Sequence, residues 1–260
     1  MFKGISELTA ALMAALALGS AVPAMAQAIV VRSTGPSASE YPAGKRLPAG
    51  ASVTLRGGDQ VTVLDKAGTR VLRGAGSFAI DSTVNRDRGT AALLARSLSN
   101  PVAVRAGAVR GEGTAIPGDE PIPVSIWLAD IDSASKGGGR VCLPRGSDLY
   151  LWRSSSQARR FVWVGEADGG GTVRVAMPAH TSGVAWPKAM LALAEGHRYR
   201  ISDEGAGGQA DAGKSSEFEL VMLEPETVPA DAAALGTLLL DNGCKAQFDW
   251  LATTLERLDG

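Results

Sequence analysis

One stretch of the 260-residue chain matches a nucleotide-binding motif, because Gly208–Ser215 reads GQADAGKS and fits the pattern G-x-x-x-x-G-K-[ST]. Such a loop binds phosphates when a strand precedes it and a helix follows, since the amides of the helix N-terminus and the lysine surround the phosphate. Here Glu217–Leu223 follows, and its apolar residues alternate with polar ones at the period of a strand. We therefore expect a glycine-rich hairpin loop and no nucleotide partner.

Other residues that commonly do chemistry form no catalytic or metal-binding pattern. Neither of the two histidines, His180 and His197, belongs to an H-E-x-x-H or similar ligand spacing. The serine run Ser154–Ser156 lacks the G-x-S-x-G turn that presents a hydrolase nucleophile. We expect no catalytic residue, no metal site and no cofactor, and hence a protein that is not an enzyme.

A hydrolase that uses two carboxylates is the enzymatic alternative that stays open. Glycoside hydrolysis needs two convergent carboxyl groups, and Asp130 and Asp132 flank the end of a predicted strand. The competing interpretation, which we favour, is that these aspartates cap a turn.

Four of the five tryptophans, all beyond residue 123, offer the best sign of a binding surface. Trp127 and Trp163 lie inside apolar strands and are expected in the core. Trp152, beside Arg153, and Trp186 lie at the ends of elements, where an exposed indole can stack on a sugar or anchor a partner. These three residues form our candidate recognition surface, although burial of both tryptophans in the core remains the alternative.

The two cysteines, Cys142 and Cys244, are predicted to form one disulfide if the chain is exported. A catalytic thiol and a bond between two chains are the alternatives.

The first 26 residues resemble an export signal. Lys3 is followed by the apolar stretch Leu8–Val22, and Ala24 and Ala26 form an A-x-A cleavage site that precedes Gln27. We expect cleavage after Ala26 and a soluble periplasmic product. An uncleaved anchor is the alternative, but no later apolar run is long enough to span a membrane, so stable insertion after cleavage is not expected.

Composition places the chain among ordinary globular proteins. The chain has 45% hydrophobic residues, and 26 basic residues balance 27 acidic ones. Because no strong positive field exists, a nucleic-acid partner is not expected.

The elements that must position these residues are mostly short strands separated by glycine-rich turns. Residues 27–98 are expected to form a small β-roll or sandwich with a short helix at Arg88–Leu98, and residues 99–123 are expected to form a Pro/Gly-rich linker. Within the first unit, Gly57–Asp59 and Lys66–Gly68 are the expected hairpin connections. Residues 124–260 are expected to form an Ig-like β-sandwich followed by two helices. The strands expected in the sandwich are Val124–Ile131, Arg140–Leu143, Leu149–Arg153, Arg160–Glu166, Thr172–Met177, His197–Ser202 and Glu217–Leu223. The first of these helices should begin near Pro229 and stop at Asn242 and Gly243, and the second should begin near Lys245.

The first half resembles the Gly-Asp and glycine-rich strand pattern of FecR-like periplasmic domains. The residues that carry this resemblance are Val30–Pro36, Leu55–Asp59, Val63–Asp65 and Gly68–Gly76. The second half is similar to a Gram-negative protein family that is often encoded near membrane signalling proteins with CHASE-type sensor domains, through Val124–Trp127, Cys142–Leu143, Leu151–Arg153, Trp186–Pro187 and Gly243–Gln247.

The resemblance implies a binding protein rather than an enzyme. It suggests a non-enzymatic periplasmic accessory protein for an envelope signalling or sensing system, with a membrane-bound sensor protein as its partner. The alternatives are an envelope module that binds glycan or protein, and a carboxylate-dependent periplasmic hydrolase.

Overall fold

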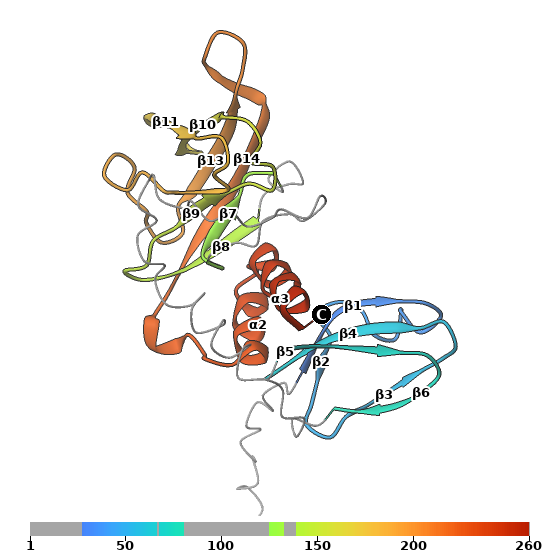
Figure 1. Cartoon of the computed structure of the whole chain (residues 1–260). Coiled ribbons are helices and arrows are strands. Elements are labelled where there is room, and N and C mark those ends of the chain that lie inside the picture. The colour runs from blue at the N-terminus through green and yellow to red at the C-terminus, as the bar shows by residue number, and fades with distance from the viewer. Residues whose placement is uncertain (1–27, 67, 81–124, 133–138, 260) are drawn as a thin grey trace, which may run out of the picture.

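The computed structural model describes residues 28–66, 68–80, 125–132 and 139–259. The protein is mainly β, as predicted, with several sheets and two helices near the C-terminal end (Figure 1). The predicted export signal, the helix at 88–98 and the linker at 99–123 lie outside the described residues.

The first β unit contains two small antiparallel sheets. The four-stranded sheet has the order β2-β1-β4-β5 and consists of β1 (Ala28–Thr34), β2 (Arg46–Leu47), β4 (Gln60–Asp65) and β5 (Gly68–Arg73). The two-stranded sheet pairs β3 (Ser52–Leu55) with β6 (Gly76–Ala79). Because β3 pairs with β6 and not with β4, the turn at 57–59 carries the chain between sheets, and our expectation of a hairpin there is wrong. The predicted hairpin after β4 is present, closing on the pair Asp65 and Gly68.

The Gly-Asp pattern that carries the family resemblance has a structural role in this unit. Asp59 is buried, and its carboxylate accepts hydrogen bonds from the backbone N–H groups of Ser37 (2.9 Å) and Arg56 (2.5 Å). Gly35, with φ 101°, lies so close that a Cβ would stand 2.5 Å from Asp59 Oδ1. This aspartate therefore ties the loop after β1 to the turn before β4, and a glycine at 35 is required by both space and backbone.

The second β unit is a sandwich of two sheets. The larger sheet has the order β11-β10-β13-β14-β8 and consists of β8 (Gly139–Pro144), β10 (Arg160–Glu166), β11 (Thr172–Met177), β13 (Arg198–Glu204) and β14 (Ala210–Leu223). The smaller sheet has the order β12-β9-β7 and consists of β7 (Leu128–Asp130), β9 (Tyr150–Trp152) and β12 (Gly183–Ala185). The pairs β8–β14 and β7–β9 are parallel, and every other pair is antiparallel.

The two helices join the β units. Helix α2 (Ala232–Asp241) begins after Asp231, whose side chain accepts a hydrogen bond from the N–H of Ala234 at 2.8 Å. It therefore starts later than the predicted Pro229, because Asp231 caps it and a short 3₁₀ turn, η2 (Pro225–Thr227), precedes it. It ends before Asn242 and the left-handed Gly243 as predicted, and helix α3 (Lys245–Asp259) begins where expected.

Helix α3 packs against β5 of the first unit and β8 of the second, and α2 packs against α3 and against β1 and β4. Figure 1 shows both helices lying between the two β units. Leu64 of β4 belongs to the same core as Leu235 of α2 and Phe248 of α3, and this core continues into the sandwich. Since Val61 and Val63 face the separate core of the first unit, β4 is buried on both faces.

The free edge of β8 is fastened to α3 by one covalent bond and one amide. Cys142 and Cys244 form the predicted disulfide, which excludes a free thiol at either residue. Gln247 is buried, and its side chain accepts from Cys142 N–H at 2.6 Å and donates to Cys142 O at 2.8 Å and Ile126 O at 3.0 Å. The glutamine thus satisfies backbone groups of the edge strand as a further strand would.

Candidate functional site

The recognition surface predicted at Trp152, Arg153 and Trp186 is wrong, because these residues are 3%, 2% and 4% exposed. Trp152 packs edge-on against Trp250 of α3, with ring centroids 4.2 Å apart. Trp186 contacts the ring of Tyr199 at 5.3 Å, and its indole N–H donates to Leu191 O at 2.8 Å. Although they lie at the ends of strands, these side chains turn into the sandwich and its junction with α3.

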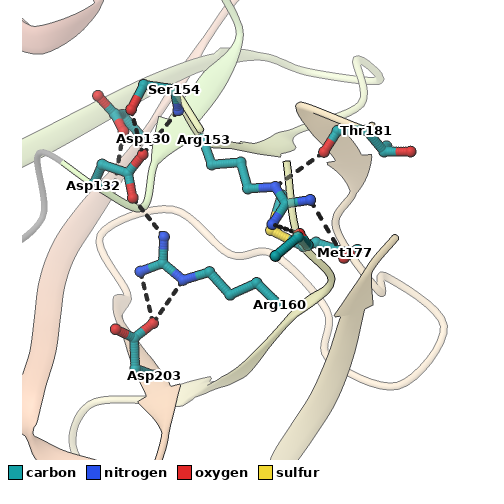
Figure 2. Close-up of polar contacts among 9 residues, drawn as sticks. Asp130, Asp132, Arg153, Ser154, Arg160, Met177, Thr181 and Asp203 are labelled. Carbon is teal, nitrogen blue, oxygen red and sulfur yellow. Dashed lines mark hydrogen bonds and ion pairs between the residues drawn. The ribbon is translucent and has the colours of Figure 1, made fainter. Parts of the chain in front are cut away.

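Arg153 has a structural role in the loops around it. Its guanidinium donates to the carbonyl oxygens of Thr181 (3.0 Å), Ala158 (2.7 Å) and Pro178 (2.6 Å), as Figure 2 shows in part. Burial lowers the pKa of Arg153, and the nearby Arg160 lowers it further. The side chain therefore holds two loops of the sandwich through their backbones and presents no charge to a ligand.

Asp130 and Asp132 form a turn, as the favoured interpretation predicted. Asp130 Oδ1 accepts the N–H of Asp132 at 2.8 Å. Asp132 Oδ2 accepts both the N–H and the hydroxyl of Ser154 at 2.8 Å, and Oδ1 accepts from Arg160 (Figure 2). Arg160 also donates two hydrogen bonds to Asp203 Oδ1, at 2.9 and 2.7 Å. One guanidinium thus links the turn after β7 to the strands β10 and β13.

This pairing weakens the carboxylate hydrolase alternative. Burial alone would raise the pKa of Asp132, but the hydrogen bonds from Arg160 and Ser154 and the charge of Arg160 outweigh burial and lower it. Asp132 and Asp203 both line a hollow of about 300 Å³, but Arg160 is bonded to both carboxylates there. A general acid needs a raised pKa, so Asp132 is the wrong group for that role.

The two histidines lie apart and form no cluster. His197 is exposed and its Nδ1 is 3.7 Å from Glu166. His180 is exposed and its backbone is left-handed (φ 61°). Its backbone N–H donates to Ser156 O at 2.6 Å. Among the described residues, no group of three histidine, cysteine, aspartate or glutamate side chains is arranged to hold a metal ion.

The stretch that matches the phosphate-binding motif is part of a hairpin. Ala210–Leu223 is one long strand, β14, whose pairing with β13 runs from Glu204–Ala210 to Arg198–Glu219. The chain after Lys214 is therefore a strand, as the alternation predicted, and the helix that phosphate binding requires is not there.

The most promising site is the outer face of the five-stranded sheet. In β10, Val162 and Val164 face the core, while Phe161, Trp163 and Gly165 lie on the opposite face. Trp163 is half-buried and lines a hollow of about 450 Å³. The other lining residues are Gly165, Glu166, Thr172, Arg200, Ser202, Ala210, Ala212, Ser215 and Glu217.

Ion pairs surround this hollow. Arg200 donates to Glu217 Oε1 from Nε at 2.9 Å and from Nη2 at 2.6 Å, and Arg198 bonds the other oxygen of Glu217. Hydrogen bonds from Arg200 and Arg198 lower the pKa of Glu217. Across the sheet, Arg174 stacks on the ring of Phe161 at 3.7 Å and pairs with Glu204. The hollow thus has an aromatic residue in a setting of balanced charge.

The sequence prediction placed Trp163 in the core and so missed this site. The continuous apolar run Phe161–Val164 suggested a strand covered on both faces. In the described part of the chain, however, neighbours of Trp163 on the outer face, Thr172 and Arg174 of β11, are exposed. The signal that could have located the site is the alternation of arginine and glutamate in Arg198, Arg200, Glu217 and Glu219, which indicates a solvent-facing surface.

Comparisons with protein-family models, with curated proteins and with solved structures find no match for this chain. Within residues 28–259, as far as they are described, no helix is long and apolar enough to cross a membrane.

Proposed function

We propose that the chain is an exported, non-catalytic binding protein whose ligand site is the hollow on the outer face of the five-stranded sheet. The observation that carries this proposal is the half-buried Trp163, which lines about 450 Å³ of concave space. Concave sites of this size with an aromatic residue and a few polar groups are the usual places of small-molecule binding.

Export to the periplasm is part of the proposal. The buried disulfide between Cys142 and Cys244 supports it, because such bonds persist in oxidising compartments. The A-x-A pattern before Gln27 supports cleavage of a signal peptide at that point.

An accessory role in envelope sensing follows from the resemblance of residues 28–80 to FecR-like domains. In this proposal the second β unit binds a ligand and a membrane-bound sensor protein contacts the chain elsewhere. Crosslinking in the native host, followed by mass spectrometry, tests this part. A single membrane sensor protein recovered with the mature chain is the expected result, and recovery of no sensor protein would contradict the accessory role.

The binding role itself is tested by a photo-crosslinking amino acid at Ala212. This residue is exposed and lines the hollow, and its small side chain makes replacement mild. The matched control carries the same amino acid at Lys66, an exposed position at the hairpin after β4.

We expect an adduct with an envelope component from position 212 that disappears in the Trp163→Ala background, and none of this adduct from position 66. Equal labelling from both positions, or labelling from 212 that survives Trp163→Ala, would contradict the proposed site.

A further inference from the structure

The exposed part of Trp163 is apolar. Its indole Nε1 is buried, so the part of the side chain that faces the hollow is carbon framework. Gly165, Ala210 and Ala212 are small residues of the lining, which contribute little side-chain volume to the hollow. The hollow therefore presents a flat ring that can stack against an apolar face of a ligand.

The charges around the ring are already balanced, which disfavours an anionic ligand. Besides the two bonds to Glu217, Arg200 donates from Nη2 to Ala167 O at 3.0 Å. Glu166 adds a carboxylate to the lining, and its Oε1 lies 3.7 Å from His197 Nδ1. A phosphate or carboxylate would meet two glutamates and an arginine whose charge is compensated, so the field favours an uncharged ligand.

The polar groups of the lining suit a ligand with many hydroxyl groups. Ser202 and Ser215 lie directly opposite each other on β13 and β14. Ser215 donates to Ala212 O at 3.0 Å, which leaves its lone pairs as acceptors. Together with the Arg200–Glu217 pair, the site offers donors and acceptors within one hollow, and a hydroxyl group can use both.

A peptide that adds a strand does not fit this location. Strand addition needs an edge with free backbone groups, but β10 is paired with β11 and β13 on its two sides, and β13 is paired with β10 and β14. The ligand must therefore be recognised by side chains on the face of the sheet.

We infer that this hollow binds an uncharged carbohydrate, with one sugar ring stacked on Trp163 and its hydroxyl groups bonded to Arg200, Glu217 and the two serines. This inference rests on the proposed binding function and names the class of ligand.

Calorimetric titration of the mature chain with defined oligosaccharides tests the inference. The uncharged probes are cellohexaose, laminarihexaose, maltohexaose and chitohexaose, and the anionic probe is hexagalacturonate. We expect at least one uncharged probe to bind with a Kd below about 1 mM. Hexagalacturonate should show no detectable binding at the same concentrations.

Three variants locate the binding. Trp163→Ala should weaken it by at least about tenfold, whereas Trp163→Phe, which keeps a stacking ring and guards against misfolding, should retain most of it. The matched control is Trp250→Ala, which removes another half-buried tryptophan, one that packs on Trp152 of the smaller sheet. It should leave the Kd unchanged.

The inference is overturned if no uncharged probe binds, if hexagalacturonate binds more tightly than all of them, or if Trp163→Ala binds as well as the native chain. If the adduct from position 212 still depends on Trp163 in any of these cases, only the ligand class is wrong. If that adduct is also missing, the binding function fails with it.

Discussion

The two faces of the five-stranded sheet are made by the same strands but differ in burial: the inner face is part of the core, and the outer face is open to solvent. The inner face buries Val162, Tyr199 and Phe218 against the smaller sheet and the helices. The outer face carries Trp163 and a set of arginine–glutamate pairs that solvent reaches. Tryptophan and arginine occur on both sides, so residue type alone does not say which of them bind a ligand.

The two sides differ in the hydrogen-bond partners of their arginine side chains and in how far solvent reaches them. On the covered side, Arg153 is 2% exposed and is bonded to backbone carbonyls. On the open side, Arg198 has 52% of its side chain exposed and pairs with Glu217. Losing a buried donor leaves acceptors unsatisfied, whereas water replaces a lost surface partner. Large effects on stability are therefore expected on the covered side, and effects on binding on the open side.

The largest expected effect is loss of the disulfide that fixes the β8 edge. The double variant Cys142→Ala with Cys244→Ala should lower the free energy of unfolding by about 4 to 5 kcal/mol, because the bond spans a sequence separation of 102 residues. Urea unfolding of the oxidised native chain and of the variant measures this. A loss below about 1 kcal/mol would contradict the view that the covered side depends on this bond.

Removal of the buried guanidinium should come next. Arg153→Met keeps much of the side-chain volume but removes the guanidinium donor from the carbonyl oxygens of Thr181, Ala158 and Pro178. We expect a loss of about 3 kcal/mol in the free energy of unfolding, measured by the same urea titration. A native-like midpoint would mean that water serves these carbonyls and that the site is more open than its burial indicates.

The sequence predicted the strands of the sandwich better than the surroundings of its tryptophans. Arg160–Glu166 and Thr172–Met177 have the predicted bounds because each shows a continuous or alternating apolar pattern. The strand Gly183–Ala185 was not predicted, because three residues are too few to show an alternation of apolar and polar side chains. The first part of β14 was missed because Gly213 and its polar neighbours pair with β13 without any apolar alternation.

The burial of Trp152 and the exposure of Trp163 could not be predicted locally. Trp152 is covered by Trp250, a residue of α3 far along the chain, and the disulfide and Gln247 help to hold that helix against β8. Trp163 is open because the described elements leave the outer face uncovered. Both facts depend on how distant segments of the chain are arranged in space. The alternation of apolar residues along a strand indicates only the face of the strand on which a residue lies.

A smaller effect is expected from the Asp132–Arg160 pair, and it should depend on pH. Despite burial, the hydrogen bonds and charge of Arg160 hold the pKa of Asp132 below the ordinary aspartate value of 3.8 in the folded protein. The stabilisation is therefore present above that value and is lost as the pH falls through the lower folded pKa. Asp132→Asn should cost about 1 kcal/mol near neutral pH and less near pH 3. Urea titrations at the two pH values measure the difference. An equal cost at both would show that the carboxylate charge is irrelevant there.

The smallest effect should come from the open face. Arg198→Met removes one partner of Glu217, but Arg200 remains bonded to the same carboxylate and solvent reaches the vacated position. The midpoint of urea unfolding should therefore match that of the native chain, while oligosaccharide affinity should fall slightly if Glu217 becomes less well held. A clear loss of stability with unchanged affinity would contradict the division of roles, because it would make the outer charges part of what holds the sheet together.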